Sequence, residues 1–417
     1  MDKLRITGGK RLRGRVRIAG SKNAALPALA AALLTGEEVV LDNLPRVRDV
    51  RTMLRVLEQL GASVSVTADG GATVKTERLA SFEAPYDLVK TMRASVLVLG
   101  PLLARRGRAR VSLPGGCAIG ERPINLHLDG LARMGAVIDL QHGYVEARAE
   151  RLHGATIAFP SKTVGGTENL MMAASIAHGT TILQNAAKEP EVVSLAEMLV
   201  AMGASIHGAG TDEIVVEGQD RLGSASHRVI PDRIEAGTYV VAAALSGDGV
   251  ELDGVRLEHL EPVAEQLARA GVPIRASESG VRVSAPAELL SRDLRTAPHP
   301  GFPTDMQAQY MALMTQARGT AVIAETIFEH RFMHVGELLR MGADIRIEGH
   351  TAVVVGPAPL TGAQVMATDL RASACLVLAA LVADGVTVID RVYHLDRGYE
   401  PMEEKLGSLG ASVERIR

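Results

Sequence analysis

The feature that most constrains this chain is a short motif that occurs six times at nearly constant spacing. In each occurrence a glycine follows Leu, Met or Ala and precedes Ala or Val, between a helix-like stretch and a β-like run; the glycines are Gly61, Gly135, Gly203, Gly271, Gly342 and Gly410. Successive glycines lie 68 to 74 residues apart. Such a period indicates one supersecondary unit copied six times. Matched positions of different copies can therefore face one shared site.

Each copy has the same order of elements. An apolar helix comes first, predicted over 24–34, 94–104, 170–177, 238–245, 306–317 and 372–383. A glycine near its end is typical of a left-handed helix stop; these are Gly36, Gly107, Gly179, Gly249, Gly319 and Gly385. A short strand, a loop and an amphipathic second helix follow. Copies one to five then show two alternating strands joined by a turn.

Copy six stops early, at residues 411–417, whereas residues 4–6 and 15–18 have the strand pattern that it lacks. We therefore expect the N-terminal segment to complete the last unit. The chain would form two domains of three units, one over 21–229 and one over 230–417 with 1–20 added. The first helices are apolar nearly all round, which predicts an α/β fold with helices inside each domain and sheets outside. The two chain crossings would make a natural hinge.

Composition narrows the class of protein. The 417 residues, 47% of them apolar, suffice for two substantial cores, and a net charge of −3 argues against a general nucleic-acid binder. No apolar run approaches the ~18–20 residues that cross a bilayer, and the start lacks a secretory-signal pattern. Two cysteines do not form a disulfide framework. We expect a reduced, cytoplasmic protein without nucleic-acid or membrane partners. The oligomeric state stays open, with a monomer favoured.

Cations recur where the first helices begin. Lys22, Arg93 and Arg371 stand at matched helix starts in copies one, two and six. A helix N-terminus carries partial positive charge and suits anions, so a cation there does little for the helix itself. A solvated side chain is the alternative at each position. Three cations at equivalent positions favour an anion site.

A second matched position is the loop after the short strand. It supplies Cys117 and Arg122 in copy two, Arg331 in copy five and Arg397 in copy six. Glycines around Cys117 make its loop pliable, as a lid would be. This setting favours an exposed, tunable thiol. A buried, inert cysteine is the alternative, and it is the interpretation that Cys375 fits.

Asp305 allows two interpretations. The run from Thr304 to Gln307 reads as a capping box, with Thr304 as cap and Asp305 in the favourable first turn. This structural role could be the only role of Asp305; the other interpretation is that Asp305 is a catalytic carboxylate. His330 and His334 lack a third candidate ligand, so we expect no metal. The chain has no P-loop, zinc-type cysteine spacing or dinucleotide fingerprint.

Taken together, segments 20–25, 114–123, 328–334, 369–372 and 396–400 resemble motifs of the UDP-N-acetylglucosamine enolpyruvyl transferases of the EPSP synthase family. The resemblance spans the whole chain and implies two inside-out α/β domains, each of three βαβαββ-type units. It implies transfer of the enolpyruvyl group of phosphoenolpyruvate to the 3-hydroxyl of UDP-N-acetylglucosamine, through a tetrahedral ketal, without metal or organic cofactor.

The resemblance also implies roles for single residues. Cys117 donates the proton to the vinyl carbon and Asp305 accepts the proton of the attacking hydroxyl. Lys22, Arg122 and Arg397 bind phosphate, while Arg331 and Arg371 orient the carboxylate. The remaining substrate-binding positions are Asn23, Arg93, Pro123, Ile124, Asn125, Leu126, Thr163, Val164, Ile327 and Asp369, with Arg122 contributing here too. The family often has a lysine where this chain has Ser161, so whether Ser161 or Lys162 meets the diphosphate stays open.

Three rivals remain. A shikimate enolpyruvyl transferase shares fold and chemistry but lacks the cysteine loop. An RNA-terminal phosphate cyclase would need a nucleophilic histidine and a nucleotide site. A non-catalytic repeat scaffold would show no coupled binding of the two substrates.

Overall fold

The computed structural model describes residues 2–68, 70–90, 92–113 and 124–417, without the side chain of Arg93. Its contacts divide the chain into two compact units. One consists of residues 20–113 and 124–230, and the other of residues 2–19 and 231–417. Each unit buries an apolar core of its own. We refer to them as the 20–230 unit and the 231–417 unit.

The 20–230 unit contains three four-stranded sheets of one design, in which a parallel pair is followed by antiparallel strands. The first has the order β14-β3-β5-β4 (Ala225–Arg228, Glu38–Asp42, Ala72–Lys75, Ser63–Val66). The second is β6-β7-β9-β8 (Glu83–Ala84, Arg108–Ser112, Tyr144–Arg148, Val137–Gln141). The third is β10-β11-β13-β12 (Thr156–Ala158, Thr180–Gln184, Glu213–Glu217, Ser205–His207).

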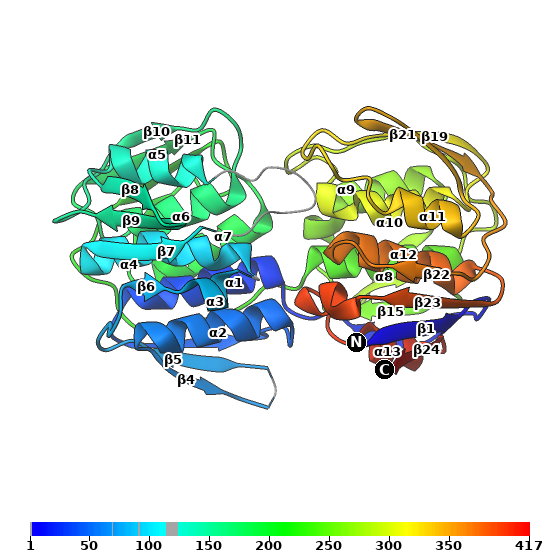
Figure 1. The fold of residues 1–417 in the computed structure, drawn as a ribbon, viewed down its shortest axis with the longest axis horizontal. Coiled ribbons are helices and arrows are strands. Elements are labelled where there is room, and N and C mark those ends of the chain that lie inside the picture. The colour runs from blue at the N-terminus through cyan, green and yellow to red at the C-terminus, as the bar shows by residue number, and fades with distance from the viewer. Residues whose placement is uncertain (1, 69, 91, 114–123) are drawn as a thin grey trace. The chain divides into compact units, whose positions relative to one another are not determined.

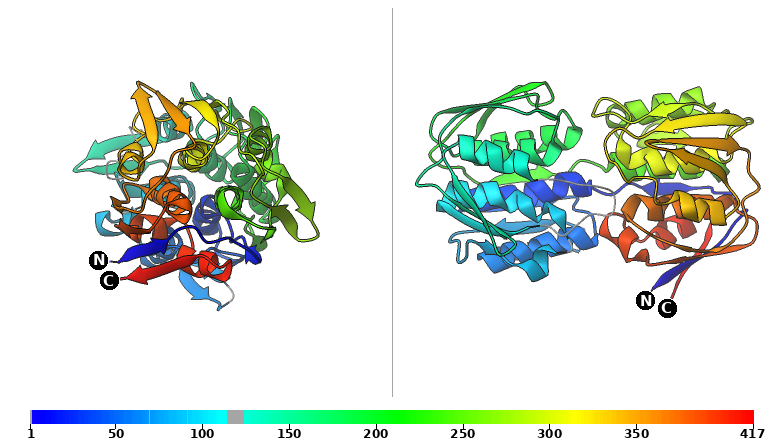
Figure 2. Two further views of the ribbon diagram at one scale, coloured as in Figure 1. Left: turned by 90° about the vertical axis from the view of Figure 1, so that its right-hand side faces the viewer. Right: turned by 45° about the horizontal axis from the view of Figure 1, so that its top comes forward.

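The 231–417 unit repeats this design. Its sheets are β16-β17-β15-β2 (Ile274–Ser277, Gly280–Val283, Val250–Asp253, Arg15–Arg17) and β18-β19-β21-β20 (Leu294–Arg295, Gly319–Ala324, Thr351–Gly356, Asp344–Glu348). The third is β22-β23-β1-β24 (Gln364–Met366, Val386–Asp390, Lys3–Thr7, Ser412–Ile416). The N-terminal strand β1 thus lies between two strands from the other end of the chain, and the two termini lie side by side (Figure 2).

The first helix of each copy lies in the interior of its unit, with the sheets around it (Figure 1). These helices are α1 (Lys22–Ala31), α4 (Leu99–Arg106), α6 (Val164–Ala174), α8 (Arg233–Ser246), α10 (Gln307–Met314) and α12 (Leu370–Val382). Nearly all their residues are buried because Ala, Leu, Val and Met cover every side. The predicted α/β class, with helices inside and sheets outside, is confirmed.

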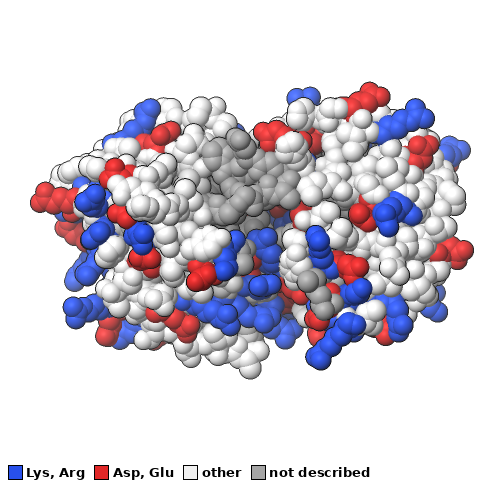
Figure 3. All heavy atoms as spheres, viewed as in Figure 1, with Lys and Arg blue, Asp and Glu red and all other residues white. Residues whose placement is uncertain are grey.

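The second helices are α2 (Arg48–Leu60), α5 (Asn125–Arg133), α7 (Pro190–Ala201), α9 (Leu257–Arg269), α11 (Val335–Arg340) and α13 (Met402–Ser408). Helix α2 shows their amphipathic pattern: Met53 and Leu57 are buried, while Arg48, Arg51 and Arg55 are exposed. Basic side chains accordingly gather over this helix (Figure 3). Short helices complete the fold: α3 (Tyr86–Val89), η1 (Ala32–Leu34), η2 (Arg93–Val98), η3 (Thr304–Met306) and η4 (Val392–Arg397).

The repeated glycine ends the second helix of each copy. All six motif glycines have positive φ, between 93° and 107°, a region that side chains with a Cβ rarely adopt. Gly61, for example, is the left-handed C-cap of α2. The strand after each glycine then begins within two residues in every copy except the fourth, where β16 begins three residues later.

Two details of the predicted fold are wrong. Strand β2 does not complete copy six but pairs in parallel with β15 of copy four, so the N-terminal segment serves two different sheets. Among the first-helix glycines, Gly107 is a left-handed helix cap, but Gly36 has no positive φ. The other four have positive φ in turns beyond the helix end, immediately before or at the next strand.

None of the helices in the described ranges combines the length and apolar character needed to cross a membrane.

Candidate functional site

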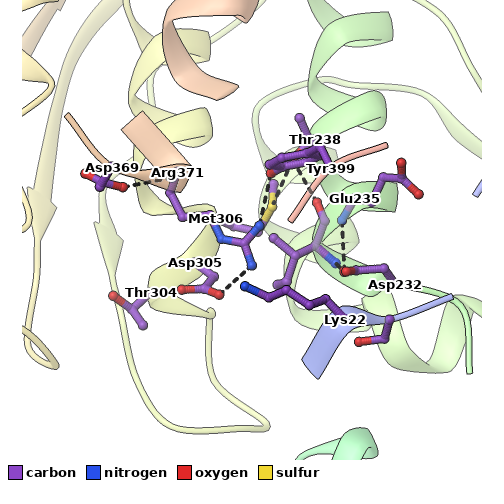
Figure 4. Close-up of polar contacts among 12 residues, drawn as sticks. Lys22, Asp232, Glu235, Thr238, Thr304, Asp305, Met306, Asp369, Arg371 and Tyr399 are labelled. Atoms are coloured by element: carbon purple, nitrogen blue, oxygen red, sulfur yellow. Dashed lines mark hydrogen bonds and ion pairs between the residues drawn. The ribbon is translucent and has the colours of Figure 1, made fainter. Parts of the chain in front are cut away.

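A buried charged cluster of the 231–417 unit is built around Asp305, on the short helix η3. Its Oδ1 accepts a hydrogen bond of 2.7 Å from Nη2 of Arg331. Its Oδ2 accepts one of 2.7 Å from Nη2 of Arg371 (Figure 4). Arg331 follows β19 in copy five, and Arg371 lies in the first turn of α12 in copy six. Three residues that the sequence predicts for the site are thus brought together.

Burial makes this cluster electrostatically strong. The side chains of Arg331 and Arg371 are only 4% and 6% exposed, whereas that of Asp305 is 26% exposed. Burial opposes ionisation of Asp305, but the charges of Arg371 and Arg331 and their hydrogen bonds outweigh it and hold its pKa well below the ordinary value. Two cations against one carboxylate leave one positive charge, which suits the binding of an anion.

Arg371 is held in place by a buried polar network that the sequence did not predict. Its Nη1 donates to the hydroxyl of Tyr399 at 3.2 Å, and that hydroxyl lies 2.9 Å from Oγ1 of Thr238 on α8. Nε2 of Gln309 lies within hydrogen-bond distance of both hydroxyls and of the carbonyl oxygen of Asp305, among which its two N–H groups are shared. A signal in the sequence was the pair of glutamines, Gln307 and Gln309, in a helix that is otherwise mostly apolar; both side chains are fully buried.

Thr304 orients Arg331 instead of capping a helix. Nη1 of Arg331 donates to the Thr304 hydroxyl at 3.1 Å, and that hydroxyl donates to Oε2 of Glu325 at 2.9 Å. Oε1 of Glu325 accepts from the Thr296 hydroxyl and from the backbone N–H of Ile327. The predicted capping box is therefore wrong, because these partners occupy the hydroxyl of Thr304 and η3 has no side-chain cap.

Asp369 and Arg397, also in the 231–417 unit, have different surroundings. Oδ1 of Asp369 caps α12 by accepting from the backbone N–H of Arg371 at 2.8 Å, so it positions the first turn that carries this arginine. Arg397 ends η4 and is half-buried. Cys375, in the middle of α12, is fully buried, and burial raises the pKa of its thiol, as the inert interpretation predicts.

In the 20–230 unit, Lys22 is the first residue of α1 and is 9% exposed. Its Nζ lies 3.3 Å from Oδ2 of the buried Asp49 on α2. Ser21 caps this helix by accepting from the N–H of Ala24. Asn23 follows on α1 and is partly exposed.

The start of α6 carries Thr163 and Val164. The Thr163 hydroxyl caps this helix by accepting from the N–H of Gly166 at 3.1 Å. Nζ of Lys162 lies 2.6 Å from Oδ1 of Asp212, whereas Ser161 is exposed. The neighbouring helix α5 begins at Asn125, with Ile124 as its cap residue and Leu126 following.

Cys117, Arg122 and Pro123 lie outside the described residues, as does the side chain of Arg93. The part of the chain that the structure describes contains no group of three His, Cys, Asp or Glu side chains that could hold a metal ion.

Comparisons with known proteins show which family the chain belongs to. The profile of EPSP synthase (3-phosphoshikimate 1-carboxyvinyltransferase) matches residues 6–406. The chain belongs to the EPSP synthase family.

Within this family, the chain is 58% identical to the UDP-N-acetylglucosamine 1-carboxyvinyltransferase of Geotalea uraniireducens (strain Rf4) and 59% identical to that of Solibacter usitatus (strain Ellin6076). Both alignments cover 100% of each chain. The crystal structure of the enolpyruvyl transferase NikO from Streptomyces tendae matches with a TM-score of 0.92 and 29% identity, over 100% of this chain and 99% of that one. EPSP synthase from Acinetobacter baumannii shares the fold, with a TM-score of 0.78 at 17% identity over the whole of both chains.

Proposed function

We propose that the protein is a UDP-N-acetylglucosamine 1-carboxyvinyltransferase. It transfers the enolpyruvyl group of phosphoenolpyruvate to the 3-hydroxyl of UDP-N-acetylglucosamine and releases phosphate, the first committed step of peptidoglycan synthesis. The observation that carries this conclusion is the full-length identity of 57–59% to four proteins of that name. The shikimate-type alternative has less support, because the solved EPSP synthase is only 17% identical.

The reaction proceeds by addition and elimination. The sugar hydroxyl attacks C2 of phosphoenolpyruvate while C3 takes a proton, which gives a tetrahedral ketal. The C2–O bond to phosphate then breaks and C3 loses a proton, which restores the double bond. We assign the donated proton to Cys117 and the acceptance of the hydroxyl proton to Asp305.

The cluster around Asp305 supports a role in this proton transfer. While Arg331 and Arg371 both bind its carboxylate, the low pKa of Asp305 makes it a weak base. Phosphoenolpyruvate carries a carboxylate that fits the same guanidinium groups. When the substrate carboxylate takes over these donors, Asp305 loses hydrogen bonds and its pKa rises. Substrate binding would thus convert a structural carboxylate into a competent base.

The other assignments are those that the family resemblance implies. Lys22, Arg122 and Arg397 bind phosphate. Arg331 and Arg371 hold the carboxylate, and Asp369 fixes the turn that carries Arg371. Asn23, Arg93, Pro123, Ile124, Asn125, Leu126, Thr163, Val164 and Ile327 contact the UDP-sugar.

A direct test measures phosphate release from phosphoenolpyruvate with UDP-N-acetylglucosamine, with shikimate 3-phosphate and with no acceptor. We expect release only with the UDP-sugar, together with a product heavier than the acceptor by one enolpyruvyl group. Phosphate release with shikimate 3-phosphate but not with the UDP-sugar would favour the rival transferase. No release with either acceptor, and no binding of either substrate, would favour a scaffold.

A further inference from the structure

Arg415, on β24, is an arginine on the inward face of a sheet. It lies opposite Leu4 of β1, whose side chain is fully buried. Opposite residues of paired strands point to the same face, and the inward face normally carries apolar side chains. The matched position, five residues after the motif glycine, is uncharged in the other five copies: Val66, Leu140, Gly208, Ala276 and Ile347. Copy six therefore breaks a local rule here, which calls for an explanation.

The guanidinium of Arg415 binds the end of η4 through a bidentate contact. Its Nη1 donates to Oδ2 of Asp396 at 3.0 Å, and its Nη2 donates to Oδ1 of Asp396 at 2.7 Å. Its Nε donates to Oε1 of Glu403 on α13, and a carboxylate oxygen of Asp2 lies 3.7 Å from Nη1. The Arg415 side chain is 25% exposed, so water screens these pairs only in part. Arg415 thus ties η4 and α13 to the last strand of the sheet.

Asp396 immediately precedes Arg397, and the residues after Arg397 are anchored as well. A Cβ atom added to Gly398 would be 2.6 Å from Cδ2 of Leu370 on α12, so the backbone packs closely against that helix. Tyr399 belongs to the buried polar network of the Asp305 cluster. The backbone at Arg397 is therefore held from both sides, and its half-buried side chain ends η4.

The bidentate contact also offsets a charge beside Arg397. Both carboxylate oxygens of Asp396 accept from Arg415. Without that partner, the carboxylate of Asp396 would attract the neighbouring guanidinium of Arg397 and oppose the approach of an anion. An arginine suits this task, because its planar guanidinium matches a carboxylate at two points and stays charged at every physiological pH.

We propose that Arg415 is a positioning residue for phosphate binding, which holds Asp396 and so fixes the turn that presents Arg397 to the phosphate group of phosphoenolpyruvate. Arg415 itself touches no substrate in this role. A binding residue that is held in place before the ligand arrives loses less conformational freedom on binding, which preserves affinity. The inference rests on the proposed function, because that function identifies the ligand of Arg397 as phosphate.

The test breaks the contact from each side. Arg415→Gln removes the guanidinium, and Asp396→Asn removes the charge that it binds. In both variants we expect the KM for phosphoenolpyruvate at saturating UDP-sugar, and the inhibition constant of inorganic phosphate, to rise about tenfold, since a misplacement of about 1 Å can cost up to about 10²-fold. The affinity for UDP-N-acetylglucosamine, measured by calorimetry, should stay within about twofold of wild type, because only phosphate binding is affected.

Two further variants separate positioning from a general effect on the sheet. Arg415→Lys keeps the positive charge but loses the bidentate geometry, so it should recover part of the phosphate affinity. Arg5→Gln is the matched control, because Arg5 on β1 pairs with Glu414, the neighbour of Arg415 on β24. It should leave the inhibition constant of phosphate unchanged. An equal loss of phosphate affinity in Arg5→Gln would overturn the inference.

The double variant Arg415→Gln/Asp396→Asn shows whether Arg415 acts through Asp396. We expect it to lose no more phosphate affinity than Arg415→Gln alone, because the two residues share one contact. Losses that multiply would overturn the inference, as would unchanged phosphate inhibition in both single variants. If Arg415→Gln does not fold, Arg415→Lys and Asp396→Asn provide the same comparison.

The wild-type protein distinguishes failure of this inference from failure of the proposed function. If wild type transfers the enolpyruvyl group and the variants bind phosphate as it does, only the inference fails. If wild type transfers no enolpyruvyl group to the UDP-sugar, the proposed function fails and the inference fails with it.

Discussion

At the scale of single residues, Asp305 has a structural role in the fold, and we propose a chemical role for it as well. Its carboxylate pairs with two buried guanidinium groups and offsets one of their two positive charges, which lowers the cost of keeping them out of water. The same contacts hold its pKa low and so suppress its basicity; we propose that the substrate carboxylate competes for them. The polar network of Tyr399, Thr238 and Gln309 holds Arg371 in place, and we expect it to do so during that exchange.

Asp305→Asn should lower kcat by about 10²- to 10⁴-fold, the usual contribution of a general base. The amide keeps the shape of the side chain but accepts no proton, so binding of UDP-N-acetylglucosamine should change far less than turnover. Steady-state kinetics and calorimetry on one preparation measure both. Asp344→Asn, an exposed carboxylate at the start of β20, is the control. A variant with more than a tenth of wild-type kcat would remove the base role.

The depressed pKa of Asp305 also predicts a dependence of stability on pH. The folded chain holds this carboxylate ionised below 3.8, where the unfolded chain binds a proton. Its stabilising contribution is therefore complete above pH 3.8 and is lost as the pH falls further. Wild type should lose more stability than Asp305→Asn between pH 4 and pH 2.5, as measured by urea midpoints. Parallel pH profiles would contradict the pairing with Arg331 and Arg371.

The two cysteines should respond in opposite ways to substitution. Cys117→Ala should abolish turnover, while Cys117→Asp should retain part of it, because a carboxylic acid can replace the thiol as proton donor. Cys375→Ala should lower the thermal midpoint by removing a buried side chain from α12, yet leave the acid in place. Phosphate release and thermal unfolding measure the two effects. Full activity in Cys117→Ala would exclude the acid role.

At the scale of elements, Glu168 on α6 is a buried carboxyl group whose ionisation the fold opposes. It is 3% exposed, and its Oε1 has no hydrogen-bond partner among the described residues. Burial, followed by repulsion from Glu191 and Glu189, raises its pKa well above the ordinary value. The folded chain therefore retains a proton that the unfolded chain releases above pH 4.5, and stability falls as the pH rises.

Glu168→Gln should consequently be more stable than wild type at pH 8 and equally stable near pH 4. The difference grows by about 1.4 kcal/mol per pH unit above 4.5 until the folded-state pKa is passed. Urea unfolding at both pH values provides the measurement. Glu197→Gln, on the exposed side of α7, controls for the general effect of removing a carboxylate. A gain that persists undiminished at pH 4 would assign the effect to packing instead of ionisation.

The helix ends and short strands show most clearly how far the sequence alone predicts this fold. The glycine repeat predicted six helix ends, and all six glycines have the positive φ that only glycine adopts readily. The spacing could not show that β2 pairs with β15, because the pattern of a short strand does not name its partner. The predicted capping box was wrong for a similar reason, because the Thr304 hydroxyl is hydrogen-bonded to Arg331 and Glu325, which are distant in sequence. Roles for Lys22 and Arg397 came from resemblance and stay predictions.

At the scale of the whole molecule, the two cores should respond separately to damage. Leu29 lies in the core of the 20–230 unit and Leu376 in that of the 231–417 unit, and both are fully buried. Replacing either with Ala should cost about 2–5 kcal/mol. We expect hydrogen exchange, read by mass spectrometry, to accelerate mainly in the unit that carries the substitution. Equal acceleration in both units would mean that they unfold as one.

The position of β1 between two C-terminal strands has a consequence for how this chain folds during its synthesis. Both neighbours of β1 come from the far end of the chain, about 400 residues later for β24. At roughly 5–20 residues per second, the ribosome takes about 20–80 seconds to synthesise the chain between β1 and β24, so β1 lacks this partner for that time. The strands of residues 20–230 find all their partners much earlier, since every sheet there is assembled from that stretch. A nascent polypeptide can thus complete the sheets of residues 20–230 first. The apolar residues Leu4 and Ile6 remain accessible to chaperones until synthesis ends.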